Sequence, residues 1–128
     1  MNLEPLVENF FSIGKKASGS KDQAVLHAFR NAAKRLRYTI EMLDPKGAGE
    51  WLRRLKLVQE HLGKMNDAFV AEKYLRNLPN RSMQARPLPA KLHAEALNHI
   101  SKFQSTWQRR FGPRTEKAWI TWARQLEQ

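Results

Sequence analysis

Residues 27–38 read HAFRNAAKRLRY, and this stretch decides the fold because it carries two stripes of side chains at helical spacing. At about 100° per residue, one arc of the helix is apolar and contains Leu26, Phe29, Ala33, Leu36, Ile40 and Leu43. The neighbouring arc is cationic and contains His27, Arg30, Lys34 and Arg37. The apolar arc predicts a helix that packs on one side against a protein core.

The cationic arc borders the apolar arc instead of opposing it, and Glu41 is the only acidic residue on it. Like charges three or four residues apart destabilise a helix by about 0.2–0.5 kcal/mol per pair. We therefore expect an anion from outside the chain to balance these cations. The alternative is an ordinary amphipathic helix whose charges face water.

Apolar residues repeat at helical spacing through most of the remaining chain, and no segment alternates as a β-strand does. The predicted helices cover residues 3–16, 22–43, 51–62, 66–78, 92 to a break near 112, and 114–128, with a polar, proline-bearing loop over 79–89. Ser20 or Asp22 is expected to cap the second helix, and Gly63 to end the third. The expected fold is an all-α antiparallel bundle of about five to six helices in one domain, residues 1–128.

Composition limits the classes of partner and compartment. Lysine and arginine total 23 against 12 acidic residues, which gives a formal net charge of +11 and predicts attraction to polyanions. The absence of cysteine excludes disulfides and thiolate metal sites. Residues 1–16 lack the features of a signal peptide, and no window has the roughly 18 apolar residues of a membrane span. We therefore expect a soluble, cytoplasmic protein with no membrane partner.

Two blocks of sequence in this order resemble the CHAD domain, the conserved histidine α-helical domain that binds inorganic polyphosphate. The first block is HxxRxxxKRLRY at residues 27–38, and the second is LRRLKLVQEHLGKMNDAFVA at residues 52–71. The resemblance covers residues 27–78 and implies a helical bundle with a basic groove or pore. The resemblance also implies which residues contact phosphate: His27, Arg30, Lys34, Arg35, Arg37 and Lys56.

For two of these six residues, the assignment as a phosphate contact depends on the resemblance alone. Periodicity puts Arg35 away from the cationic arc, where it would be solvated. On the third predicted helix, Lys56 borders one side of the apolar face while Arg54 and His61 border the other, and the resemblance favours Lys56. For His27, periodicity allows either a phosphate contact or a packing or capping role at the start of the helix.

The chain departs from this family in one respect. Family members usually contain two halves, each with its own histidine–arginine block, whereas this sequence has one block and no internal repeat. Either one bundle is enough for weak binding, or two copies pair as a homodimer to rebuild the full cationic surface.

The motifs of catalysis and of metal binding are missing from the sequence. There is no phosphate-binding GxxxxGK[ST] loop, no G-x-S-x-G nucleophile motif and no cluster of histidines with acidic residues. We therefore expect a non-catalytic protein without cofactor or metal that binds inorganic polyphosphate, in the cytoplasm or on polyphosphate granules. The alternatives are generic binding of nucleic acid at low salt and docking onto an acidic protein.

Tryptophan is the remaining unusual feature. Each of the four tryptophans, Trp51, Trp107, Trp119 and Trp122, falls on the apolar stripe of its predicted helix. This spacing favours core packing or a protein interface over stacking on nucleic-acid bases. Trp119 and Trp122, near the end of the chain, are the residues that we expect a second subunit to share.

Overall fold

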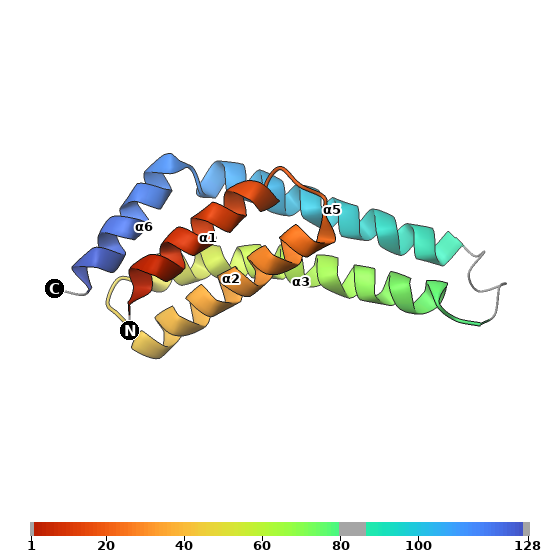
Figure 1. Cartoon of the computed structure of the whole chain (residues 1–128), viewed down its shortest axis with the longest axis horizontal. Coiled ribbons are helices and arrows are strands. Elements are labelled where there is room, and N and C mark those ends of the chain that lie inside the picture. Colours follow the sequence, from red (N-terminus) through yellow and green to blue (C-terminus); the bar gives the residue numbers. More distant parts are fainter. Residues whose placement is uncertain (1, 80–86, 127–128) are drawn as a thin grey trace.

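Five helices account for most of residues 2–79 and 87–126, which are the residues that the computed structural model describes. The helices are α1 (Leu3–Ala17), α2 (Gln23–Leu43), α3 (Gly49–Arg76), α5 (Pro87–Arg110) and α6 (Pro113–Gln125) (Figure 1). The described ranges contain no strand. The prediction of an all-α bundle is confirmed.

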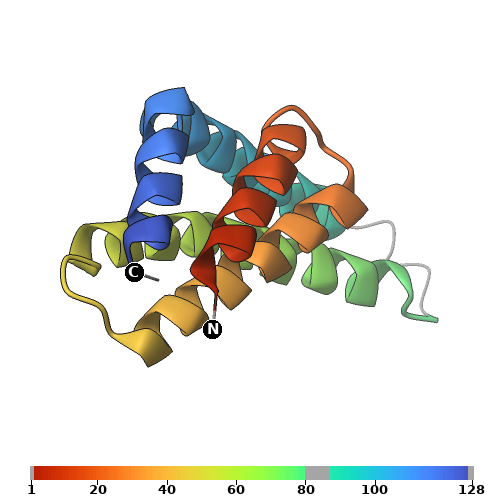
Figure 2. The same cartoon turned by 60° about the vertical axis from the view of Figure 1, so that its left-hand side comes forward.

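The helices pack as neighbours that run in opposite directions. Helices α3 and α5 form a long hairpin, α2 packs on α3, and α1 packs on α2 and α6 (Figures 1 and 2). Two ion pairs join α1 to α6, one near each end of the two helices. Lys15 lies 2.9 Å from Glu116, and Arg124 lies 2.6 Å from Glu4. The far end of the α3–α5 hairpin extends past the start of α2 (Figures 1 and 2).

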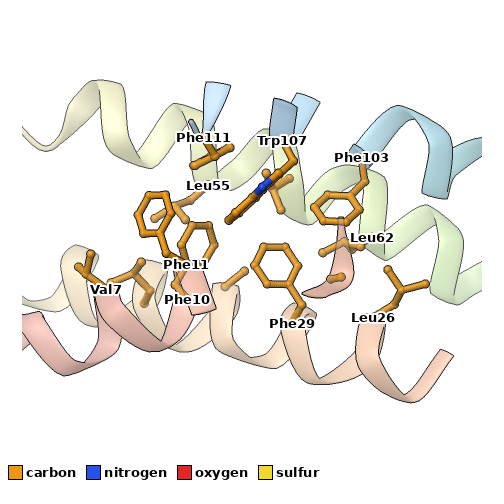
Figure 3. Close-up of a cluster of buried hydrophobic side chains, with 14 of the residues drawn as sticks. Val7, Phe10, Phe11, Leu26, Phe29, Leu55, Leu62, Phe103, Trp107 and Phe111 are labelled. Atoms are coloured by element: carbon orange, nitrogen blue, oxygen red, sulfur yellow. The ribbon is translucent and has the colours of Figure 1, made fainter. Parts of the chain in front are cut away.

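Aromatic side chains from several helices form the centre of the core (Figure 3). Phe10 of α1 lies with its ring centroid 5.2 Å from Phe11 and 5.1 Å from Phe29 of α2. Trp107 of α5 packs 5.5 Å from Phe29, edge to face. Burial of such large apolar surfaces is the main source of stability for a bundle.

The tryptophans belong to this chain's own packing. Trp119 is 3% exposed and lies 4.4 Å from the ring of Trp51 and 5.9 Å from Phe10. Trp122 lies 4.3 Å from Trp51. The prediction of core packing is confirmed, while the expectation that a second subunit shares Trp119 is wrong, because α1 and α3 already cover it.

Local signals fix both ends of α2. The Asp22 side chain accepts a 2.9 Å hydrogen bond from the backbone N–H of Ala24, which is the expected N-cap. Asp44 ends the helix in the left-handed region with φ 44°, and its N–H donates to the carbonyl of Ile40. These two ends hold the cationic arc within one continuous helix.

The predicted break at Gly63 does not exist, and α3 runs uninterrupted through it. A glycine inside a helix costs about 1 kcal/mol relative to alanine. Leu62 and Met65 on either side are buried in the core, and this packing outweighs the weak propensity. Asn66 and Asp67, expected to start a new helix, are therefore interior residues of α3.

The start of α5 also differs from the sequence prediction. The helix begins at Pro87, five residues before the expected Leu92, and it includes Pro89. Proline is tolerated in the first turn of a helix because the N–H groups there have no intrahelical acceptor. Residues 87–89 therefore belong to the helix, while residues 80–86 of the predicted loop lie outside the described residues.

Candidate functional site

A groove of about 660 Å³ lies between α2 and α3, where α3 continues past the start of α2. Its walls come from the first turns of α2 and from the last three turns of α3. Its lining residues are Gln23, Ala24, His27, Arg30, Met65, Asn66, Phe69, Val70, Glu72, Lys73, Arg76 and Asn77. The lining combines apolar side chains with three permanent cations, Arg30, Lys73 and Arg76, and one carboxylate, Glu72.

Four of the five α2 residues predicted to contact phosphate are unpaired among the described residues, and the fifth, Arg37, is paired within the chain. His27 and Arg30 line the groove, and Lys34 continues their arc one turn further along α2. Arg35 is exposed on the outer face of α2, where it does not line the groove. Among the described residues, none of these four side chains has a hydrogen bond or an ion pair, so their donors are free to bind a ligand.

Arg37 is different, because it already has partners within the chain. Its Nε donates to Oε1 of Glu41 at 2.7 Å, and its Nη1 donates to Oε1 of Gln59 on α3 at 3.2 Å. Its guanidinium also lies 5.6 Å from the centre of the Tyr38 ring. The expectation that the whole cationic arc lacks local partners is therefore wrong at Arg37, since Glu41 follows it by one turn.

Lys56 extends the cationic path on the α3 side. It is exposed, and it precedes Gln59 by three residues, which puts the two side chains on the same side of α3. The contact of Gln59 with Arg37 shows that this side borders α2. Lys56 has no hydrogen bond or ion pair to a described residue, so it can contribute charge at the far end of the α2–α3 seam.

Helix α3 contributes cations to the groove that periodicity and the family resemblance do not predict. Lys73 is exposed and unpaired among the described residues. Arg76 donates through Nε to Glu72 at 2.7 Å. The sequence contains a pattern that indicates this side of α3, because Gln59, Asn66 and Lys73 repeat every seven residues. The pattern requires a continuous helix, and the predicted break at Gly63 interrupts it.

Glu72 is the acidic residue of the groove, and its side chain is only 12% exposed. Burial alone would raise the pKa of this carboxyl. Hydrogen bonds from His93, whose Nδ1 lies 3.0 Å away, and from Arg76 outweigh burial and lower the pKa. Glu72 is thus a fixed anion that orients Arg76 and neutralises part of its charge.

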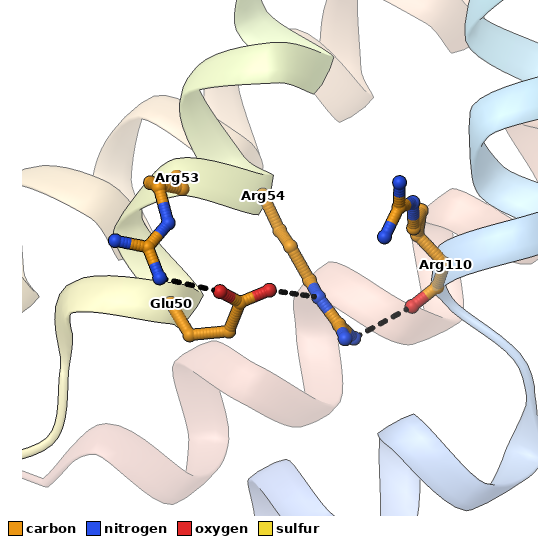
Figure 4. Close-up of polar contacts among 4 residues, drawn as sticks. All are labelled: Glu50, Arg53, Arg54 and Arg110. Carbon is orange, nitrogen blue, oxygen red and sulfur yellow. Dashed lines mark hydrogen bonds and ion pairs between the residues drawn. The ribbon is translucent and has the colours of Figure 1, made fainter.

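A second basic cluster, at the other end of α3, is tied up within the chain (Figure 4). Glu50 accepts from Arg53 at 2.6 Å and from Arg54 at 3.2 Å, and the bond from Arg53 is the main reason that the pKa of Glu50 is lowered. Arg54 also donates to the backbone carbonyl of Arg110 at 3.1 Å. These contacts consume donors that a ligand would need.

Residues 2–79 and 87–126 contain neither a metal-binding cluster nor a membrane-spanning helix. No group of three or more histidine, aspartate or glutamate side chains there could hold a metal ion. No helix of this part of the chain has the length and apolar character to cross a membrane.

The described helices form an all-α bundle with a basic groove between α2 and α3. The model of the CHAD domain family matches residues 2–76, and the chain belongs to this family. The family is associated in general with polyphosphate binding. No curated protein and no solved structure matches the chain.

Proposed function

We propose that this chain is a non-catalytic module that binds inorganic polyphosphate along the seam between α2 and α3. One observation carries the proposal. Arg30, Lys34 and Lys73 lie along this seam or its groove and have no carboxylate partner among the described residues. Membership of a family associated with polyphosphate supports the same ligand.

The chemistry of the ligand fits this arrangement of donors. A polyphosphate is a flexible line of anionic oxygens without base edges, so many charge-assisted hydrogen bonds in a row must recognise it. Arginine supplies paired planar donors, and lysine supplies a mobile point charge. From His27 to Arg37 the helix rises about 15 Å, which is long enough to follow several phosphate units.

Nucleic acid is the second candidate, because the net charge of +11 attracts any phosphate backbone at low salt. A competition experiment separates the two ligands. Labelled single-stranded DNA is bound to the protein, and long-chain polyphosphate or unlabelled DNA is titrated in as competitor, with both concentrations expressed as total phosphate. Polyphosphate should displace the probe at a clearly lower concentration. Equal potency of both competitors would favour generic polyanion binding over the proposed function.

Docking of an acidic protein onto the same cations is a third candidate function. The same competition experiment distinguishes it from binding of polyphosphate or DNA. A protein that binds neither polyphosphate nor DNA at low salt would favour it.

Pairing of two copies is a secondary part of the proposal, as is association with polyphosphate granules in the cytoplasm. The chain has one histidine–arginine block, so a homodimer would double the number of cations available to one ligand. Light scattering with and without polyphosphate tests the pairing. A strict monomer that binds tightly would remove the need for a second copy.

A further inference from the structure

A second hollow adjoins the groove, and the proposed ligand does not explain it. This hollow, of about 480 Å³, is lined by Val70, Lys73, Tyr74, Asn77 and Leu78. Val70, Lys73 and Asn77 line both hollows. A ligand bound in the groove therefore has the second hollow beside it, on the other side of Lys73.

The second hollow exposes apolar and aromatic surface beside a cation. Val70 is 60% exposed and Tyr74 is 67% exposed, and they lie one turn apart on the part of α3 near its C-terminal end. Within residues 2–79 and 87–126, the Tyr74 ring contacts no other ring and no cation. An inorganic phosphate chain has no apolar surface with which to cover these side chains, whereas a ligand with an aromatic ring would do so.

On this basis we propose that the site also binds nucleoside oligophosphates, an inference that rests on the proposed phosphate-binding function. The phosphate chain lies in the groove against Arg30 and Lys73, and the base stacks on the ring of Tyr74. Every nucleobase offers a flat face to an aromatic side chain, so this contact does not require a particular base. The Asn77 amide, which lines both hollows, offers a donor and an acceptor to the edge of the base or to the ribose.

The size and charge of the site agree with such a ligand. Pockets for small molecules commonly have about 300–1,000 Å³, and the groove has about 660 Å³. Three permanent cations, Arg30, Lys73 and Arg76, face a single carboxylate, Glu72, so the groove keeps a positive excess. A groove with apolar and cationic lining, beside a hollow that contains an exposed tyrosine, suits a ligand with one anionic end and one aromatic end.

The test compares ATP with inorganic tripolyphosphate, which has the same three-phosphate chain but no base. Isothermal titration in magnesium-free buffer gives the dissociation constant of each ligand for the wild-type chain, for Tyr74→Ala and for Tyr74→Phe. We expect ATP to bind at least about fivefold more tightly than tripolyphosphate to the wild type. This preference should disappear in Tyr74→Ala and persist in Tyr74→Phe, which keeps the ring. Tyr38→Ala, which removes an exposed tyrosine outside the hollow, is the matched control and should keep the preference.

Two results would overturn the inference. One is an affinity for ATP no higher than for tripolyphosphate, and the other is a preference that survives in Tyr74→Ala. If long-chain polyphosphate still binds in either case, the inference about the base fails while the proposed function stands. Failure of every phosphate ligand to bind would reject both.

Discussion

Arg37 of α2 donates a 3.2 Å hydrogen bond to the side-chain oxygen of Gln59 on α3. This contact shows that the side of α3 that carries Gln59, and with it Lys56, borders α2. It also gives Arg37 a structural role that the other cations of α2 lack, because its second partner, Glu41, neutralises its charge.

Arg30 and Arg37 should therefore respond differently to substitution by glutamine. Arg30→Gln removes an unpaired cation of the groove, and we expect the affinity for polyphosphate to fall about fivefold to tenfold at low salt. Arg37→Gln should reduce this affinity less and lower the free energy of unfolding by up to about 1 kcal/mol, as is typical for partly exposed ion pairs. Titration calorimetry and chemical denaturation of both variants measure the two effects. A larger loss of affinity for Arg37→Gln would contradict this assignment.

Lys73 is expected to bind phosphate although the family resemblance does not point to it. Lys73→Gln should weaken polyphosphate binding by about threefold to tenfold at low salt. Lys117→Gln is the matched control, because Lys117 is an exposed lysine of α6 without a partner among the described residues and lies outside the groove. Equal losses for the two variants would mean that net charge alone determines binding.

Two glycines should respond in opposite directions to substitution by alanine. A Cβ at Gly14 would collide with the indole of Trp107, and such overpacking typically costs about 1–3 kcal/mol. A Cβ at Gly63 would meet no atom within 4 Å, so Gly63→Ala should raise the free energy of unfolding by about 0.5–1 kcal/mol. Denaturant melts of both variants provide the measurement. Destabilisation by Gly63→Ala would argue against a continuous α3.

Acid should destabilise the fold through His61. Burial is the main cause that lowers the pKa of His61, and electrostatic repulsion from His99, Lys102 and Lys64 adds to it, while Glu60 opposes it. Because the folded state holds the proton less well than the unfolded state, the contribution is fully present above the usual pKa of about 6.5 and is lost as the pH falls through the lowered value.

The free energy of unfolding should therefore decrease between pH 7 and pH 5, and His61→Gln should make this decrease smaller. Denaturant melts over this range measure it. An identical pH dependence for His61→Gln and the wild type would show that His61 is not responsible.

Periodicity alone was enough to predict the bundle, because each helix needs one apolar face and the sequence repeats that face at helical spacing. The error at Gly63 has a physical cause. Local propensity treats glycine as a stop, whereas the buried neighbours Leu62 and Met65 stabilise the helix through tertiary packing that no local rule contains.

The candidate site was predicted in part for a related reason. The cations of α2 lie within one continuous stretch of helix, so their shared arc is visible in the sequence. The α3 side of the groove depends on the register between two helices, which periodicity does not specify. Lys73 was therefore missed, and the pairing of Arg37 with Gln59 could not be foreseen.

The salt dependence of polyphosphate binding tests the central claim most directly. Binding isotherms for polyphosphate of one defined length, at several salt concentrations, give a slope of log affinity against log salt that reflects the number of cations engaged. For the triple variant Arg30→Gln, Lys34→Gln, Lys73→Gln, we expect the magnitude of this slope to fall by about two to three and the affinity to fall at least about tenfold. A folded triple variant with the slope and affinity of the wild type would contradict the claim that these unpaired cations bind polyphosphate.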